Sequence, residues 1–121
     1  MYLTEVVLRF NDCINNKDVE GLDELMAEDH SFIDGGNNVF SGKENCLHAW
    51  EGFFQMFPDY KNVFKQVTED DDLVKVEGYS QCSDPILAGP ALWTAKIKAG
   101  RIYEWRVYED NAANRKLLKL I

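Results

Sequence analysis

His30 and Asp34 are the side chains of this sequence best suited to proton transfer. A carboxylate can act as a general base, and an imidazole titrates near neutral pH. Residues 30–34 read as a short strand, in which alternate side chains share a face, so the two groups could form a relay. Two alternatives stay open: Asp34 caps the turn that begins at Gly35, and His30 lies at the surface at the strand end.

A second candidate group consists of six large aromatic side chains: Phe10, Trp50, Phe54, Tyr79, Trp93 and Trp105. In a domain with an internal pocket, such rings would hold a flat or apolar small molecule. Aromatic residues at helical or strand spacing also fill ordinary cores, and both interpretations stay open. Tyr79 either offers the pocket a polar group or faces solvent beside Lys75 and Glu77.

No motif predicts a metal or a cofactor. The two histidines, His30 and His48, do not form a recognisable ligand set, and the acidic run at 69–72 lacks the spaced ligands of a calcium loop. No nucleotide or flavin fingerprint is present. We therefore expect no metal and no cofactor.

Composition narrows the classes of partner. The 121 residues suit a single domain, and 13 basic against 21 acidic residues give a net charge of −8. This charge disfavours nucleic acid and anionic membranes as partners. The start lacks the features of a signal peptide, and the three cysteines are widely spaced with no CxxC pair. We expect reduced thiols and a cytoplasmic location.

The first half of the sequence is predicted to be mainly helical. Apolar residues at helical spacing predict a helix over residues 3–16, and Asp18 can cap a second. A short strand at 30–34 and a turn follow. Ser41–Glu44 reads as a capping box that starts a third helix, which Pro58 ends.

Strands dominate the second half. Alternating apolar and polar residues predict strands at 60–68, 73–82, 91–98 and 101–109. Ala99–Gly100 suits a two-residue hairpin between the last two. The tail at 111–121 reads either as a short amphipathic helix or as an extension that docks on a partner subunit. Helices followed by antiparallel strands predict an α+β fold with helices on one face of a curved sheet.

Several short motifs occur in a characteristic order: Asp18–Leu22, Ala27–Phe32, Phe40–Glu44, Phe57–Asp59, Gly89–Trp93 and Gly100–Trp105. This succession resembles the nuclear transport factor 2-like superfamily, in its SnoaL-like and ketosteroid isomerase-like branch, over residues 3–110. The resemblance implies one cone-shaped domain over residues 1–121, with 111–121 as a C-terminal extension. It also implies three helices packed on a strongly bent, mostly antiparallel sheet, a pocket at the open end, and a homodimer formed through the outer sheet face.

The resemblance also bears on the site. It places Asp34 where ketosteroid isomerase-like enzymes carry their general base, but Phe10 stands where their tyrosine would be. Val107 falls where SnoaL-like cyclases carry an acid. Without donors for a developing oxyanion, a lone base loses several kcal/mol of catalysis.

Three hypotheses follow. The first is a protein that binds a small apolar or aromatic molecule, with weak or no catalysis. The second is an isomerase, cyclase or hydratase with Asp34 as general base, assisted by His30 or Tyr79. The third is a dimeric protein-interaction module, which a filled cone would favour.

Overall fold

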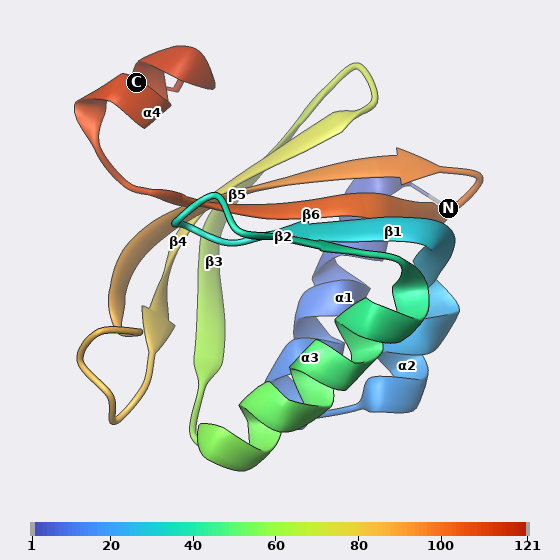
Figure 1. The fold of residues 1–121 in the computed structure, drawn as a ribbon. Helices are drawn as coiled ribbons and strands as arrows, with labels where there is room; N and C mark the ends of the chain where they lie inside the picture. The colour runs from blue at the N-terminus through green and yellow to red at the C-terminus, as the bar shows by residue number, and fades with distance from the viewer. Residues whose placement is uncertain (1, 121) are drawn as a thin grey trace.

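A computed structural model describes residues 2–120 (Figure 1). Met1 and Ile121, the two ends of the expected domain, lie outside the described residues. The helices are α1 (Leu3–Asn16), α2 (Val19–Leu25), α3 (Lys43–Met56) and α4 (Ala112–Leu117). The strands are β1 (Met26–Ile33), β2 (Val39–Ser41), β3 (Lys61–Asp70), β4 (Leu73–Gln81), β5 (Gly89–Lys98) and β6 (Arg101–Glu109). The predicted α+β fold is confirmed.

One bent sheet holds all six strands in the order β2-β1-β6-β5-β4-β3. Neighbouring strands run antiparallel, except that β1 runs parallel to β6, with Phe32 opposite Trp105. The sheet has irregularities in register between Phe64 and Gln66 and between Lys96 and Ile97. Such irregularities bend a strand and increase its twist, which suits a sheet that curves around a core.

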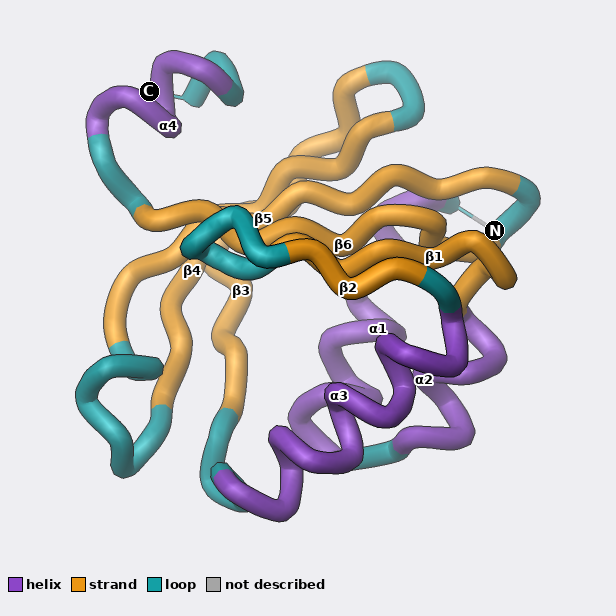
Figure 2. Tube along the Cα trace, viewed as in Figure 1, coloured by secondary structure: helices purple, strands orange, loops and turns teal. Residues whose placement is uncertain are grey.

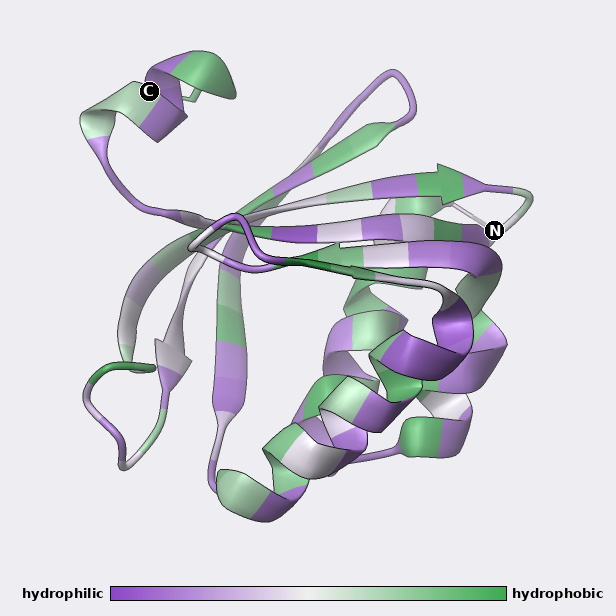
Figure 3. Cartoon of the chain, in the orientation of Figure 1, coloured by the Kyte–Doolittle hydropathy of each residue, from purple (hydrophilic) through white to green (hydrophobic). Residues whose placement is uncertain are grey.

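Helices α1, α2 and α3 cover the inner face of this sheet (Figure 1). The spacing that predicted α1 places four apolar side chains on one stripe: Val6, Val7, Phe10 and Ile14, all fully buried. They meet alternate residues of the central strands, among them Val74 and Ala95. Figure 3 shows the matching alternation of hydrophobic and hydrophilic residues along the strands. None of the described helices is long and apolar enough to cross a membrane.

The predicted capping box is wrong. Helix α3 is preceded by Gly42, whose φ of 92° is a conformation that few other residues adopt, and no side chain caps the helix. The amide of Gly42 instead donates to the His30 carbonyl at 2.8 Å. Ser41 pairs with Ser31 in the sheet, so strand pairing holds it away from the capping position.

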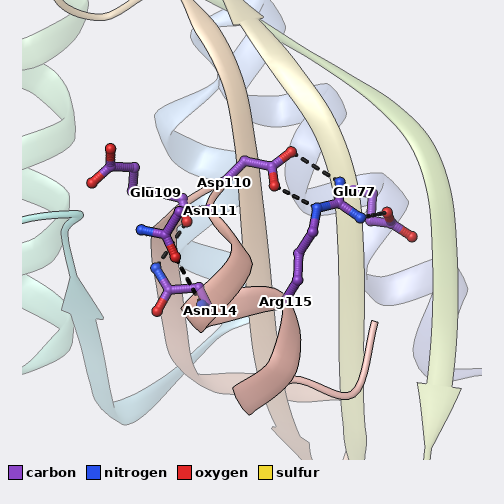
Figure 4. A network of polar contacts seen from close by, with 6 residues as sticks. All are labelled: Glu77, Glu109, Asp110, Asn111, Asn114 and Arg115. Carbon is purple, nitrogen blue, oxygen red and sulfur yellow. Dashed lines mark hydrogen bonds and ion pairs between the residues drawn. The ribbon is translucent and has the colours of Figure 1, made fainter. Parts of the chain in front are cut away.

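The C-terminal segment folds back on the outer face of the sheet (Figure 4). The Arg115 guanidinium donates to both carboxylate oxygens of Asp110, at 2.6 and 2.9 Å, and to Glu77 of β4 at 2.9 Å. The hydrogen bond from Arg115 keeps the pKa of Asp110 below its usual value. Asn111 accepts the amide of Asn114 at 2.8 Å and so caps α4. These contacts hold α4 against its own chain.

Candidate functional site

An open cavity of about 690 Å³ lies between α3 and the inner face of the sheet. The β1–β2 turn and the β4–β5 loop border it at one end of the molecule (Figure 2). Solvent-exposed lining residues such as Phe40, Ile86 and Glu109 mark its mouth. Its buried lining residues are Trp50, Asn62, Ser80, Ala91, Trp93 and Trp105.

Aromatic rings form the apolar walls of the cavity. Trp50 of α3 packs against Phe32 of β1, with 5.6 Å between ring centroids. Trp93 and Trp105 come from adjacent strands, and both pack against Phe64, at 5.0 and 6.2 Å. The indole N–H groups of Trp50 and Trp93 are buried without a hydrogen-bond acceptor among the described residues. Flat rings on several sides of one space suit a flat ligand.

A polar cluster interrupts these walls on the side of β3 and β4. The Ser80 hydroxyl donates to Asn62 Oδ1 at 2.8 Å, and the Tyr60 hydroxyl lies 3.1 Å from Ser80 Oγ. Burial raises the pKa of Tyr60, while its hydrogen bonds with Ser80 and Asn62 act in the opposite direction. These three hydrogen-bonding side chains lie together in a largely apolar interior.

Helix α1 fixes Asn62 in this position. Asn15 Nδ2 donates to the Asn62 carbonyl at 2.9 Å, and Asn15 Oδ1 accepts the Asn62 amide at 2.9 Å. Asn11 donates to the same carbonyl at 3.3 Å. Because β3 is an edge strand, these backbone groups have no strand neighbour on that side, and Asn15 takes the place of one.

Asp34 lies at the mouth, where its carboxylate bonds to its own turn. Oδ1 accepts the amides of Gly36 and Asn38, both at 2.9 Å, and Oδ2 accepts Asn38 Nδ2 at 3.1 Å. Strand β1 ends at Ile33, so Asp34 has already left the strand. This is the geometry of a turn-capping aspartate.

His30 lies inside the core and does not line the cavity. Its side chain is fully buried, and Nδ1 donates to the Ile102 carbonyl at 2.7 Å. Nε2 is buried and has no hydrogen-bond partner within residues 2–120. Burial lowers the pKa of His30, partly offset by the hydrogen bond to Ile102. The structure does not bring His30 and Asp34 together, because one packs beside Phe10 and the other borders the mouth.

Of the six aromatic residues singled out in the sequence, three line the cavity and three do not. Trp50, Trp93 and Trp105 line the cavity. Phe10 and Phe54 belong to the hydrophobic core instead. Tyr79 lies on the outer face of the sheet, where Lys65 Nζ is 5.4 Å from its ring centroid, so it does not offer its hydroxyl to the cavity.

Sequence reasoning missed the polar cluster. A signal for Ser80 was present, because it continues the inward alternation of Val74, Val76 and Gly78. Tyr60 and Asn62 had no comparable signal. Their role depends on β3 pairing with β4 so that Asn62 faces Ser80.

The lining of the cavity carries no Lys or Arg within the described chain, while the carboxylates of Asp34 and Glu109 border the mouth. An acidic mouth repels anions and tolerates neutral molecules. Residues 2–120 hold no group of His, Cys, Asp and Glu arranged for a metal ion. The interior therefore offers aromatic contact and neutral hydrogen bonds, and the two carboxylates named above lie at its mouth.

A family model described as a SnoaL-like domain matches residues 7–108. The chain belongs to this family. The SnoaL-like assignment agrees with the cone of three helices on a bent sheet and confirms the nuclear transport factor 2-like resemblance. No curated protein is similar enough in sequence to count as a match.

Solved structures share the fold of this SnoaL-like protein. A candidate polyketide cyclase from Sinorhizobium meliloti is 22% identical, with a TM-score of 0.78 over 85% of this chain and 93% of that one. An LEH-like epoxide hydrolase of M. tuberculosis is 18% identical, with a TM-score of 0.77 over 88% and 80%. A protein of Catenulispora acidiphila with a ketosteroid isomerase-like fold, in complex with trimethylamine, is 16% identical, with a TM-score of 0.77 over 97% and 94%.

Among the described residues, the buried lining of the SnoaL-like cone carries no acid. Phe10, at the position that the resemblance assigned to a tyrosine, is fully buried and packs on Trp105 at 4.7 Å. Val107 lines the cavity where the resemblance implied an acid. Glu109 lies further along β6 and is exposed at the mouth.

Proposed function

We propose that this SnoaL-like protein binds a small, flat, largely apolar molecule in its cone, with weak or no catalysis. The observation that carries the proposal is the open cavity of about 690 Å³ walled by Trp50, Trp93 and Trp105. This volume lies within the range of small-molecule sites, roughly 300–1,000 Å³. A cone filled by these three side chains would have favoured an interaction module instead.

The state of Asp34 supports binding over catalysis. Both of its carboxylate oxygens accept hydrogen bonds from the β1–β2 turn. If Asp34 took up a proton as a general base, hydrogen bonds that hold this turn would be lost. No carboxylate or imidazole lies among the buried lining residues of the described chain. A proton abstraction inside the cone would therefore lack both a base and a charged stabiliser.

The second candidate is an isomerase, cyclase or hydratase that uses Asp34 as base. It draws support from the fold shared with a candidate polyketide cyclase and an epoxide hydrolase. The variant Asp34→Asn separates the two: it would abolish turnover under the enzymatic proposal and leave ligand affinity within about twofold under the binding proposal. An activity lost in Asp34→Asn, with binding retained, would favour the enzyme.

Calorimetric titration with 2-ethylnaphthalene, a neutral flat hydrocarbon, tests the binding proposal. We expect saturable binding that is lost in Ala49→Phe, because Ala49 of α3 lines the cavity and a phenyl ring there fills it. Gln55→Phe is the matched control, since it adds the same ring to an exposed position of α3. Absence of binding to the wild type, or equal loss in both variants, would overturn the proposal.

A further inference from the structure

The polar cluster brings three hydrogen-bonding side chains together in a largely apolar interior, and the direction of its hydrogen bonds determines what it can offer. The Ser80 hydroxyl gives its proton to Asn62 Oδ1 at 2.8 Å. Asn62 is held in turn by Asn15 of α1, through two hydrogen bonds of 2.9 Å to its backbone. Asn62 and Ser80 are therefore fixed, and Ser80 Oγ is left as an acceptor.

The Tyr60 hydroxyl is the donor in its contact with Ser80, because the Ser80 proton goes to Asn62. It can turn to Ser80 Oγ, 3.1 Å away, or to an oxygen atom inside the cavity that Tyr60 lines. The ring itself is held by an edge contact with Phe53, at 4.8 Å between centroids, and Lys17 Nζ donates to the Tyr60 carbonyl at 2.7 Å. Because burial raises the pKa of Tyr60, the phenol stays protonated at neutral pH and acts as a donor.

The rest of the cavity defines the ligand that suits this donor. The lining offers no cation within the described chain, and Asp34 and Glu109 make the mouth acidic, which disfavours anions. Two further donors of the walls, the indole N–H groups of Trp50 and Trp93, have no acceptor. Buried donors that lack an acceptor complement a ligand that brings oxygen acceptors but no negative charge.

We propose that the Tyr60 hydroxyl, positioned by Ser80 and Asn62, recognises a carbonyl oxygen on a neutral ligand whose apolar body packs against the tryptophans. This inference rests on the proposed function, since it names the chemical class of ligand that the same cavity binds. A carbonyl and a methylene are similar in size, and of the two only the carbonyl accepts a hydrogen bond, so they can be compared on one carbon skeleton.

The test compares 2-acetylnaphthalene with 2-ethylnaphthalene, which have nearly the same shape, and with 2-naphthoate as the anion. We expect the wild type to bind the ketone about tenfold more tightly than the hydrocarbon, the effect of one buried hydrogen bond. The naphthoate should bind more weakly than the ketone. In infrared spectra the carbonyl band of the bound ketone should move to lower wavenumber.

The variant Tyr60→Phe should bring the ratio of the two affinities close to one while leaving the affinity for 2-ethylnaphthalene unchanged. Tyr108→Phe is the matched control, because the Tyr108 hydroxyl accepts a hydrogen bond from Thr94 Oγ1 at 3.5 Å and is not part of the polar cluster. Its ratio should match the wild type. Equal wild-type affinities for ketone and hydrocarbon would overturn this inference and leave the proposed function standing, whether or not Tyr60→Phe folds. Preference for the naphthoate, or loss of the ratio in Tyr108→Phe, would also overturn it. Failure of both neutral probes to bind would overturn the proposed function with it.

Discussion

The variant Gly78→Ala should strongly destabilise the protein, although it adds a single methyl group. Gly78 of β4 lies opposite Phe64 of β3, where the register of the pair shifts. A Cβ atom at Gly78 would overlap the Val63 carbonyl oxygen and lie 3.1 Å from Phe64 Cα. Both neighbours are backbone, so the strands would have to separate. Forcing extra volume into a packed site costs about 1–3 kcal/mol, and we expect about 3 kcal/mol here.

Gly52→Ala provides the matched control with the opposite sign. Gly52 lies within α3, and a Cβ there meets nothing within 4 Å. Alanine in a helix interior is favoured over glycine by about 0.5–1 kcal/mol, so this variant should be more stable than the wild type. Urea unfolding followed by tryptophan fluorescence measures both. If Gly78→Ala unfolds within about 1 kcal/mol of the wild type, the close approach of β3 and β4 is not as described.

Three further predictions concern single side chains. Asp34→Ala should lower the free energy of unfolding by about 1–2 kcal/mol in urea titrations, because three hydrogen bonds of the β1–β2 turn are lost; an unchanged midpoint would contradict its capping role. The folded pKa of His30 lies below 6.5, so the stability that it contributes is present above that pH and declines as pH falls below it, by at most about 1.4 kcal/mol per pH unit. A wild-type stability independent of pH between about 7 and 5 would refute the burial argument. Arg115→Ala should speed hydrogen exchange of the α4 amides without changing ligand affinity, since Arg115 joins α4 to Glu77 and Asp110; unchanged exchange would show that α4 is held otherwise.

Local pattern was enough to predict the elements of this fold. The stripe of Val6, Val7 and Phe10 predicted α1, and alternation predicted β5 and β6, which carry Trp93 and Trp105. In both cases the residues that form the pattern lie only a few positions apart in the chain. The same holds for Asp34, whose capping of the adjacent turn was one of two interpretations left open.

The candidate site depends on neighbours that are distant in the chain. The partnership of Tyr60, Asn62 and Ser80 requires one particular register of β3 on β4. Asn15 reads in sequence only as a residue near a helix end, yet it bonds to the edge strand. The burial of His30 was missed for a related reason: β1 begins at Met26, so His30 lies within the strand and not at its end. Alternation along a strand predicts the face of the sheet on which a residue lies, but it does not predict which residue of the neighbouring strand lies opposite.

The parallel pairing of β1 with β6 has a consequence for how the chain folds. Strand β6 lies between β1 and β5, so without it the sheet consists of two unconnected parts, β2-β1 and β5-β4-β3. The first part is synthesised early, while β6, which pairs with β1, is the last strand of this sheet in chain order. The apolar faces of α1 and α3 therefore stay partly uncovered until β6 has been synthesised. Pairing between strands so far apart in the chain makes folding slow, so the nascent chain has its greatest exposure to aggregation just before residues 101–109 emerge.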